Sequence, residues 1–249
     1  MSDEASGRWN PSDVAQYIAA AFTKLSHEGH WPDNVDGNAA RLLIQDLGEF
    51  AEVMVAAGRA HYWSPANALG RLFIERVEVL MGACVDNAVS KRYLDSVVAE
   101  PTAERPNRPA KRVRPEDAVG RFLSRSGLGA EDQASFRAAL VDVKNLYSEW
   151  FVHPRVMAPL LSRAAGESEN GVEEYWSHMI QLLAFGCSVS LLAANRLQVT
   201  IPVECVRALY AAGKCLEQLG NVYSEGVLDL HATIAERAVP EQAERIAGS

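Results

Sequence analysis

Hydrophobic residues recur along this chain three or four positions apart, which is the spacing of one face of an α-helix. The first stripe begins at Asn10-Pro11, where a capping side chain precedes a proline suited to the first helical position. The stripe continues to Leu25, and Gly29 and Trp31-Pro32 then end it. The pattern therefore predicts a helix that begins at Pro11 and ends near Gly29.

The same spacing predicts seven further helices, over residues 35–62, 64–98, 116–125, 131–150, 156–165, 172–195 and 203–237. Residues 172–195 are apolar on most faces, so this helix is expected to be the most buried. No alternating strand pattern and no fixed repeat are present. The sequence predicts an all-α protein, built as an irregular bundle of about six to eight helices in a single domain over residues 1–249.

The stripes of the second and third helices mark the residues expected in the core. In the second helix they are Leu42, Leu43, Leu47, Phe50, Val53 and Met54, and in the third they are Leu69, Leu72, Phe73, Val77, Leu80 and Met81.

A composition change interrupts the helices at residues 100–115, where four prolines prevent a continuous helix. We expect a mobile basic linker or long loop within the domain. Its five cations are separated by no acidic residue. They are Arg105, Arg108, Lys111, Arg112 and Arg114. They form a local patch that could contact RNA or an acidic partner, but no aromatic side chain is interleaved to stack on bases, which favours a solubilising loop.

The whole chain is acidic, with 24 basic and 32 acidic residues and a formal net charge of −8. This charge disfavours nucleic-acid binding away from the linker. The most apolar run, residues 179–194, is shorter than the roughly 20 residues that cross a bilayer, and the acidic N-terminus lacks the basic start of a signal peptide. The four cysteines lie in apolar helical stretches and are expected to be reduced core thiols, which predicts a cytoplasmic protein without membrane contact.

Phosphate-binding glycine loops and nucleophile elbows are absent from the sequence, and nothing in it predicts a cofactor. Some acidic residues and histidines have spacings that suggest metal ligands. They are Glu149 with His153, Glu174 with His178, the further carboxylates Glu49 and Glu75, and the loop residues His27, His30, Asp33 and Asp36. Helical di-metal sites pair Glu and His three positions apart, whereas both pairs here are spaced by four. Ordinary helical pairs and a solvated turn are therefore favoured over a metal site.

Arg71 and Glu75 are one helical turn apart in an otherwise apolar segment, with Leu72 and Ile74 beside them. One of the two charges is therefore expected near the core, where a charge needs a partner. His153 is the candidate third member. Convergence of the three in an open cleft would indicate a catalytic cluster, and the favoured alternative is a polar clamp that fixes the register of the helices.

Residues 66–75 (ANALGRLFIE) resemble the L-x-R-x-x-x-E helix of a group of bacterial all-helical proteins of unknown function. Residues 147–154 (YSEWFVHP) resemble a later stretch of the same group that ends in V-H-P/G. The group is similar in outline to HEPN-type helical bundles, some of which are RNases of toxin and phage-defence systems. HEPN RNases carry an Arg, four to six residues and then a His, and no histidine of this chain has an Arg at that spacing. The resemblance implies a helical bundle and leaves the Arg71, Glu75 and His153 cluster as its polar feature.

Two hypotheses follow. The first is a helical interaction or regulatory protein that binds a partner or associates with itself, with a bacterial stress or phage-defence role implied by the resemblance alone. Its candidate aromatic anchors are Tyr62, Trp63, Trp150 and Trp176. The alternative is a HEPN-like RNase or metal-dependent hydrolase that uses Arg71, Glu75 and His153.

Overall fold

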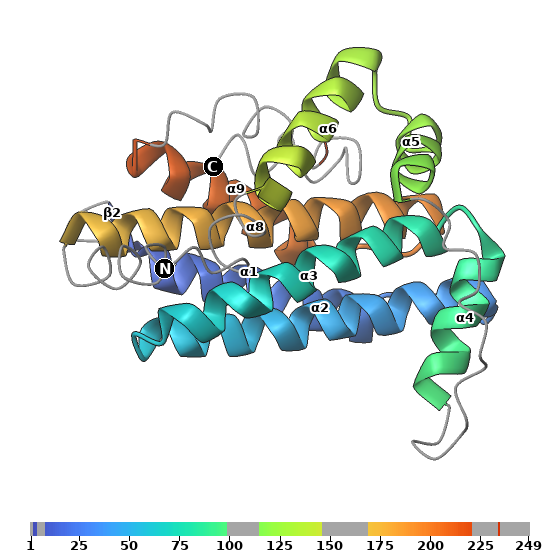
Figure 1. The fold of residues 1–249 in the computed structure, drawn as a ribbon, viewed down its shortest axis with the longest axis horizontal. Coiled ribbons are helices and arrows are strands. Elements are labelled where there is room, and N and C mark those ends of the chain that lie inside the picture. The colour runs from blue at the N-terminus through green and yellow to red at the C-terminus, as the bar shows by residue number, and fades with distance from the viewer. Residues whose placement is uncertain (1, 4–7, 99–114, 146–168, 221–233, 235–249) are drawn as a thin grey trace.

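The computed structural model describes residues 2–3, 8–98, 115–145, 169–220 and 234 (Figure 1). Within these ranges the chain forms eight helices and one antiparallel pair of two-residue strands. The helices are α1 (Pro11–Glu28), α2 (Val35–Arg59), α3 (Trp63–Ala83), α4 (Asn87–Val98), α5 (Pro115–Arg125), α6 (Ala130–Asn145), α8 (Glu169–Arg196) and α9 (Val203–Gln218), and the strands are β1 (Ser2–Asp3) and β2 (Arg8–Trp9). The predicted all-α class is confirmed.

Helix α8 is the centre of the bundle. It packs against α1, α2, α3 and α9, and Figure 1 shows α1, α2, α3 and α8 lying side by side along the long axis. Every residue from Met179 to Ala194 is buried except Gln181, which is half-buried. By length and composition α8 could cross a membrane, but 89% of its most apolar window is buried inside the bundle. The structure therefore agrees with the prediction that this segment is the most buried helix.

Glycines let α8 approach its neighbours closely. A Cβ atom at Gly186 would lie 2.4 Å from the Phe73 ring of α3, and Phe73 itself packs edge-on against Phe22 at 5.8 Å between centroids. A Cβ atom at Gly58 of α2 would lie 2.8 Å from the hydroxyl oxygen of Tyr175. Any larger residue at these two glycines would have to push α8 away from α3 or α2.

The first helix begins and ends where the sequence predicts. The Asn10 side chain accepts a hydrogen bond from the Ser12 backbone N–H at 3.0 Å, which is an N-cap. At the other end the Leu25 carbonyl accepts from the Gly29 N–H at 3.2 Å and from the Trp31 indole N–H at 3.0 Å. Asn10 at the start and Trp31 at the end, both next to the helix in the sequence, thus help to fix its two boundaries.

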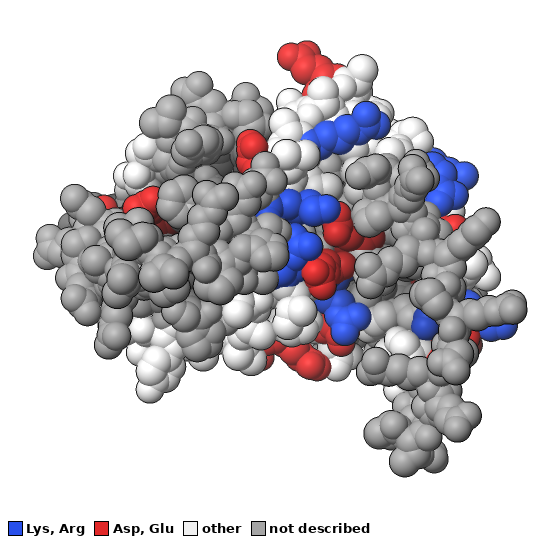
Figure 2. Space-filling view, viewed as in Figure 1, with Lys and Arg blue, Asp and Glu red and all other residues white. Residues whose placement is uncertain are grey.

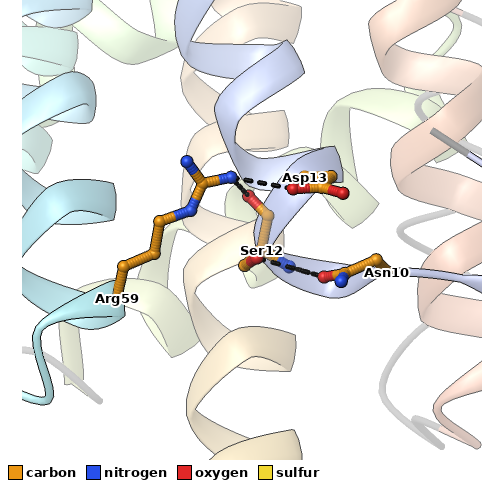
Figure 3. A network of polar contacts seen from close by, with 4 residues as sticks. All are labelled: Asn10, Ser12, Asp13 and Arg59. Carbon is orange, nitrogen blue, oxygen red and sulfur yellow. Dashed lines mark hydrogen bonds and ion pairs between the residues drawn. The ribbon is translucent and has the colours of Figure 1, made fainter.

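The cap of α1 is also joined to the end of α2, as Figure 3 shows. The Arg59 guanidinium donates to the Asp13 carboxylate at 2.9 Å and to the Ser12 carbonyl at 3.2 Å. An acid in the first turn of one helix and a cation in the last turn of the other both complement the helix dipoles. Because both side chains remain about half exposed, the pair contributes less than about 1 kcal/mol.

The expected single helix over residues 64–98 is wrong. Helix α3 ends at Ala83 and α4 begins at Asn87. The Asp86 side chain accepts a hydrogen bond from the Ala88 N–H at 3.0 Å, and the Ser90 hydroxyl donates to the Ala83 carbonyl at 2.9 Å. The first bond caps the start of α4, and the second satisfies a backbone carbonyl at the end of α3. The hydrophobic spacing nevertheless continues through this break.

Other predicted boundaries also shift. Helix α9 ends at Gln218, where Gly220 takes a left-handed φ of +64°, so a continuous helix over residues 203–237 is wrong. Helix α2 ends at Arg59, three residues before the predicted end. The basic linker up to residue 114, the end of the predicted helix 131–150 and the predicted helix 156–165 lie outside the described residues.

Replacing Gly186 by alanine tests the contact between α8 and α3. We expect Gly186→Ala to lower the free energy of unfolding by about 1–3 kcal/mol, because the added methyl group overlaps the Phe73 ring. The matched control is Gly120→Ala in α5, where the new Cβ would meet only Arg137 at 3.7 Å. It should be neutral or stabilise by up to about 1 kcal/mol. Urea unfolding followed by circular dichroism measures both, and equal stabilities of the two variants would contradict the packing.

Candidate functional site

A row of charged side chains follows the outer side of α3. Arg71, Glu75 and Glu78 are spaced by four and three residues, so they share one face of the helix. The Arg71 Nε atom lies 3.1 Å from Glu75 Oε1, and these side chains are 27% and 50% exposed. The structure forms the predicted pair, and Arg71 is the more buried of the two side chains, although both reach solvent.

The best-shielded carboxylate of this row is Glu78, whose side chain is only 12% exposed. Its Oε1 atom accepts from the Lys144 ammonium of α6 at 2.6 Å. Figure 2 shows basic and acidic side chains gathered at the middle of this face, where α3 and α6 lie in Figure 1. Sequence reasoning missed this pair because its members are 66 positions apart.

His153 lies outside the described residues, as do Glu149 and Trp150. The structure therefore brings together two members of the predicted catalytic cluster, Arg71 and Glu75, and leaves the third as a prediction. An Arg–Glu pair one turn apart on a single helix is suited to fixing side-chain positions, and a carboxylate in such a pair is also a residue type that serves as a general base.

A second polar group joins α2, α3 and α4. The Tyr93 hydroxyl of α4 donates to the Asp46 carboxylate of α2 at 2.9 Å. The Arg76 Nε atom of α3 lies 3.4 Å from the same carboxylate oxygen, and its guanidinium stands 5.7 Å from the Tyr93 ring centroid. Burial first, and then the bond to Asp46, raise the pKa of Tyr93 well above its usual value. Tyr93 therefore remains a neutral donor that holds α4 in place.

Three arginines converge on the turn between α3 and α4. Arg196 of α8 donates to the Cys84 carbonyl at 2.7 Å, and Arg125 of α5 donates to the Val85 carbonyl at 3.5 Å. Arg121 of α5 forms an ion pair with Asp86 of the same turn, at 3.6 Å. Cations are stabilised at the carboxyl end of a helix by its dipole. These arginines therefore tie α5 and α8 to the end of α3.

The first-loop aspartates are hydrogen-bonded to neighbouring side chains. Asp36 accepts from the Asn87 side chain at 3.1 Å, and Asp33 accepts from the Asn38 side chain at 3.4 Å. In the part of the chain that the structure describes, no three His, Cys, Asp or Glu residues lie close enough to hold a metal ion. The two aspartates instead fix the turn before α2 and its contact with α4.

The Glu174–His178 pair lies on α8, and Glu49 accepts from Gln45 at 3.2 Å on α2. Burial lowers the pKa of His178, and the nearby Glu174 opposes that shift only in part. A histidine held neutral by burial is able to bind a metal, but the di-metal arrangement also needs converging carboxylates. No such group is present among the described side chains.

All four cysteines are buried and free. Burial raises the pKa of Cys84, Cys205 and Cys215 to about 12, and it raises the pKa of Cys187 as well. Thiols of this kind are protonated at neutral pH and make poor nucleophiles or metal ligands. They serve as small core residues.

The outer seam between α2 and α3 is apolar. We define the α2–α3 seam as Phe50 and Val53 of α2 with Leu69 and Leu72 of α3. Val53 is 54% exposed and Leu72 is 46% exposed, while the other two are half-buried against the core. The prediction that all four belong to the core is therefore wrong for Val53 and Leu72.

The Asp46–Arg76 pair fixes how the two antiparallel helices face each other across this seam. By helical spacing from this pair, Phe50 is expected opposite Leu72 one turn closer to the α2–α3 connection, and Val53 opposite Leu69 in the next turn. Figure 2 shows uncharged side chains beside the charged ones in the part of this face that α2 and α3 form. Of the four seam side chains, Val53 and Leu72 are the two that are mainly exposed to solvent.

No protein-family model, curated protein or solved structure matches the chain. The resemblance of two short segments to a bacterial helical group therefore stays a prediction.

Two of the four predicted aromatic anchors are described. Tyr62 is 65% exposed at the connection between α2 and α3, beside the seam. Trp176 is only 7% exposed and packs edge-on against Tyr175 at 5.3 Å, so it is a core residue. Trp150 and the side chain of Trp63 lie outside the described residues. Tyr62 is thus the anchor that the structure leaves available for a partner.

Neutralising Glu78 and Glu75 in turn compares the stability contributed by the shielded Glu78–Lys144 pair with that of the exposed Arg71–Glu75 pair. We expect Glu78→Gln to lower the free energy of unfolding by about 1–2 kcal/mol, because it leaves Lys144 without its charge partner in a shielded place. The matched change Glu75→Gln should cost less than about 0.5 kcal/mol, since that pair is exposed. Chemical unfolding of both variants gives the comparison, and a larger loss for Glu75→Gln would show that Glu75 does more than pair with Arg71.

Proposed function

We propose that this chain is a helical interaction protein that acts by binding a partner, or a second copy of itself, through the α2–α3 seam. The observation that carries the proposal is the exposure of two large apolar side chains, Val53 and Leu72, on the adjacent helices α2 and α3. Exposed apolar surface costs free energy in water, roughly 25 cal/mol per Å². Large exposed apolar surfaces mark interaction sites, and a partner that covered both side chains would remove this cost.

The two exposed seam residues add to an apolar face that both helices already bury. The inward residues of the helices, such as Leu47, Met54, Phe73 and Val77, are completely buried. Val53 and Leu72 are therefore apolar side chains outside that buried face. Tyr62 extends the seam at one end with a large, half-polar ring of the type that dominates binding hot spots.

A catalytic role is the second candidate, as a HEPN-like RNase or metal-dependent hydrolase that uses Arg71, Glu75 and His153. Its support is the Arg71–Glu75 contact, which forms as the sequence predicts. RNA contact through the basic linker and a cytoplasmic location remain predictions of the sequence. A role in a bacterial stress or phage-defence system rests on the sequence resemblance.

Photo-crosslinking tests the interaction function directly. With benzoylphenylalanine at position 72, we expect one adduct of defined mass in the native host, twice the chain mass for self-association. The matched control is the same group at Val141 of α6, which is 54% exposed on a different surface. The adduct should be absent there, and it should disappear from position 72 when Val53 is replaced by Asp.

Absence of an adduct at position 72, or the same adduct at both positions, would refute the interaction function. The intact mass of the adduct is measured, and it distinguishes a partner protein from a second copy of this chain.

A further inference from the structure

Both polar groups of the Trp9 backbone bond to one side chain at the end of α9. The Trp9 N–H donates to Gln218 Oε1 at 2.7 Å, and Gln218 Nε2 donates to the Trp9 carbonyl at 3.0 Å. The two residues are 209 positions apart in the chain. A primary amide offers an acceptor and a donor side by side, so Gln218 takes the place of a neighbouring strand along this edge of β2.

The other edge of β2 pairs with β1, where Ser2 lies opposite Trp9 and Asp3 lies opposite Arg8. We call the two strands together the strap. Among the described elements outside the strap, β2 packs chiefly on α9, and the Trp9 side chain is partly buried against the core. Strands of two residues add little stability of their own. The Gln218 amide and the partial burial of Trp9 are therefore the main contacts that hold the strap on the bundle.

The helices beside the strap have contacts of their own. Helix α1 begins at the Asn10 cap, and the Arg59–Asp13 pair joins its first turn to α2. Helices α1 and α9 pack directly on each other, and Lys24 of α1 forms an ion pair with Glu204 of α9 at 2.7 Å. Opening of the strap would leave each of these contacts in place.

Opening of the strap also requires far less free energy than unfolding, because Gln218 and the Trp9 backbone exchange their mutual bonds for bonds to water. Segments with few buried contacts open locally while the rest of a protein stays folded. We infer that the strap opens and closes on a folded bundle, that the Gln218 amide holds it closed, and that opening uncovers the apolar surface under Trp9. This conformational device is independent of the α2–α3 seam.

Amide hydrogen exchange of the full-length protein, followed by NMR, tests the inference with Trp9 and Arg8 as the two reporters of the strap. In the wild-type chain both amides should be protected, yet exchange faster than the amides of α8 and at rates that low concentrations of urea do not change. Gln218→Leu removes both bonds to Trp9. Both strap amides should then exchange roughly ten-fold faster, whereas the amides of α1 and α9 should keep their rates.

The matched control is Glu217→Leu, which makes the neighbouring residue of α9 apolar and leaves the Gln218 amide in place. It should change the exchange of neither strap amide. Acceleration of Trp9 without Arg8 in Gln218→Leu would show only a lost acceptor and would overturn the inference, as would strap amides that exchange in the wild-type chain only on global unfolding. Failure of Gln218→Leu to fold would overturn it as well, because the strap would then be part of what holds the bundle together.

Discussion

Close packing of α8 against its neighbours is the constraint on which the rest of the structure depends. A helix that is buried on nearly every side must satisfy its polar groups within the protein. Ser190 does so by donating to the Gly186 carbonyl at 2.9 Å within the same helix. Gly186 in turn lets the Phe73 ring come close enough for α3 to pack directly on α8. Helices α1, α3 and α9 pack directly on this one rod, and α2 is held mainly by α1 and α3.

The surface of the molecule follows from the same constraint. Because α3 turns its largest apolar residues toward α8, its remaining sides serve other contacts. One side carries Glu78, which binds Lys144 and so positions α6. The opposite side meets α2 and carries Leu69 and Leu72 of the seam. Helix α3 thus connects the core with α5 and α6 and with the proposed binding surface.

Hydrophobic spacing predicted the helices that are long and one-sided, because burial repeats with the helical turn. It did not predict the break between α3 and α4, since that break depends on the Asp86 cap, which the apolar spacing does not register. The Arg71–Glu75 pair was predictable because its members are one turn apart. The Glu78–Lys144 contact joins different helices, and the exposure of the seam depends on which flank of each helix the neighbours leave open. The local sequence spacing predicts neither this contact nor the exposure of the seam, because both depend on how the helices pack.

Native-state hydrogen exchange across α8 tests the central claim most directly. If α8 is the rod around which the other helices are packed, its amides from 182 to 194 should exchange only when the whole protein unfolds. Their exchange free energies should then equal the free energy of global unfolding measured with denaturant. Amides of α8 that exchange through local openings, at free energies below those of α2, would contradict the account.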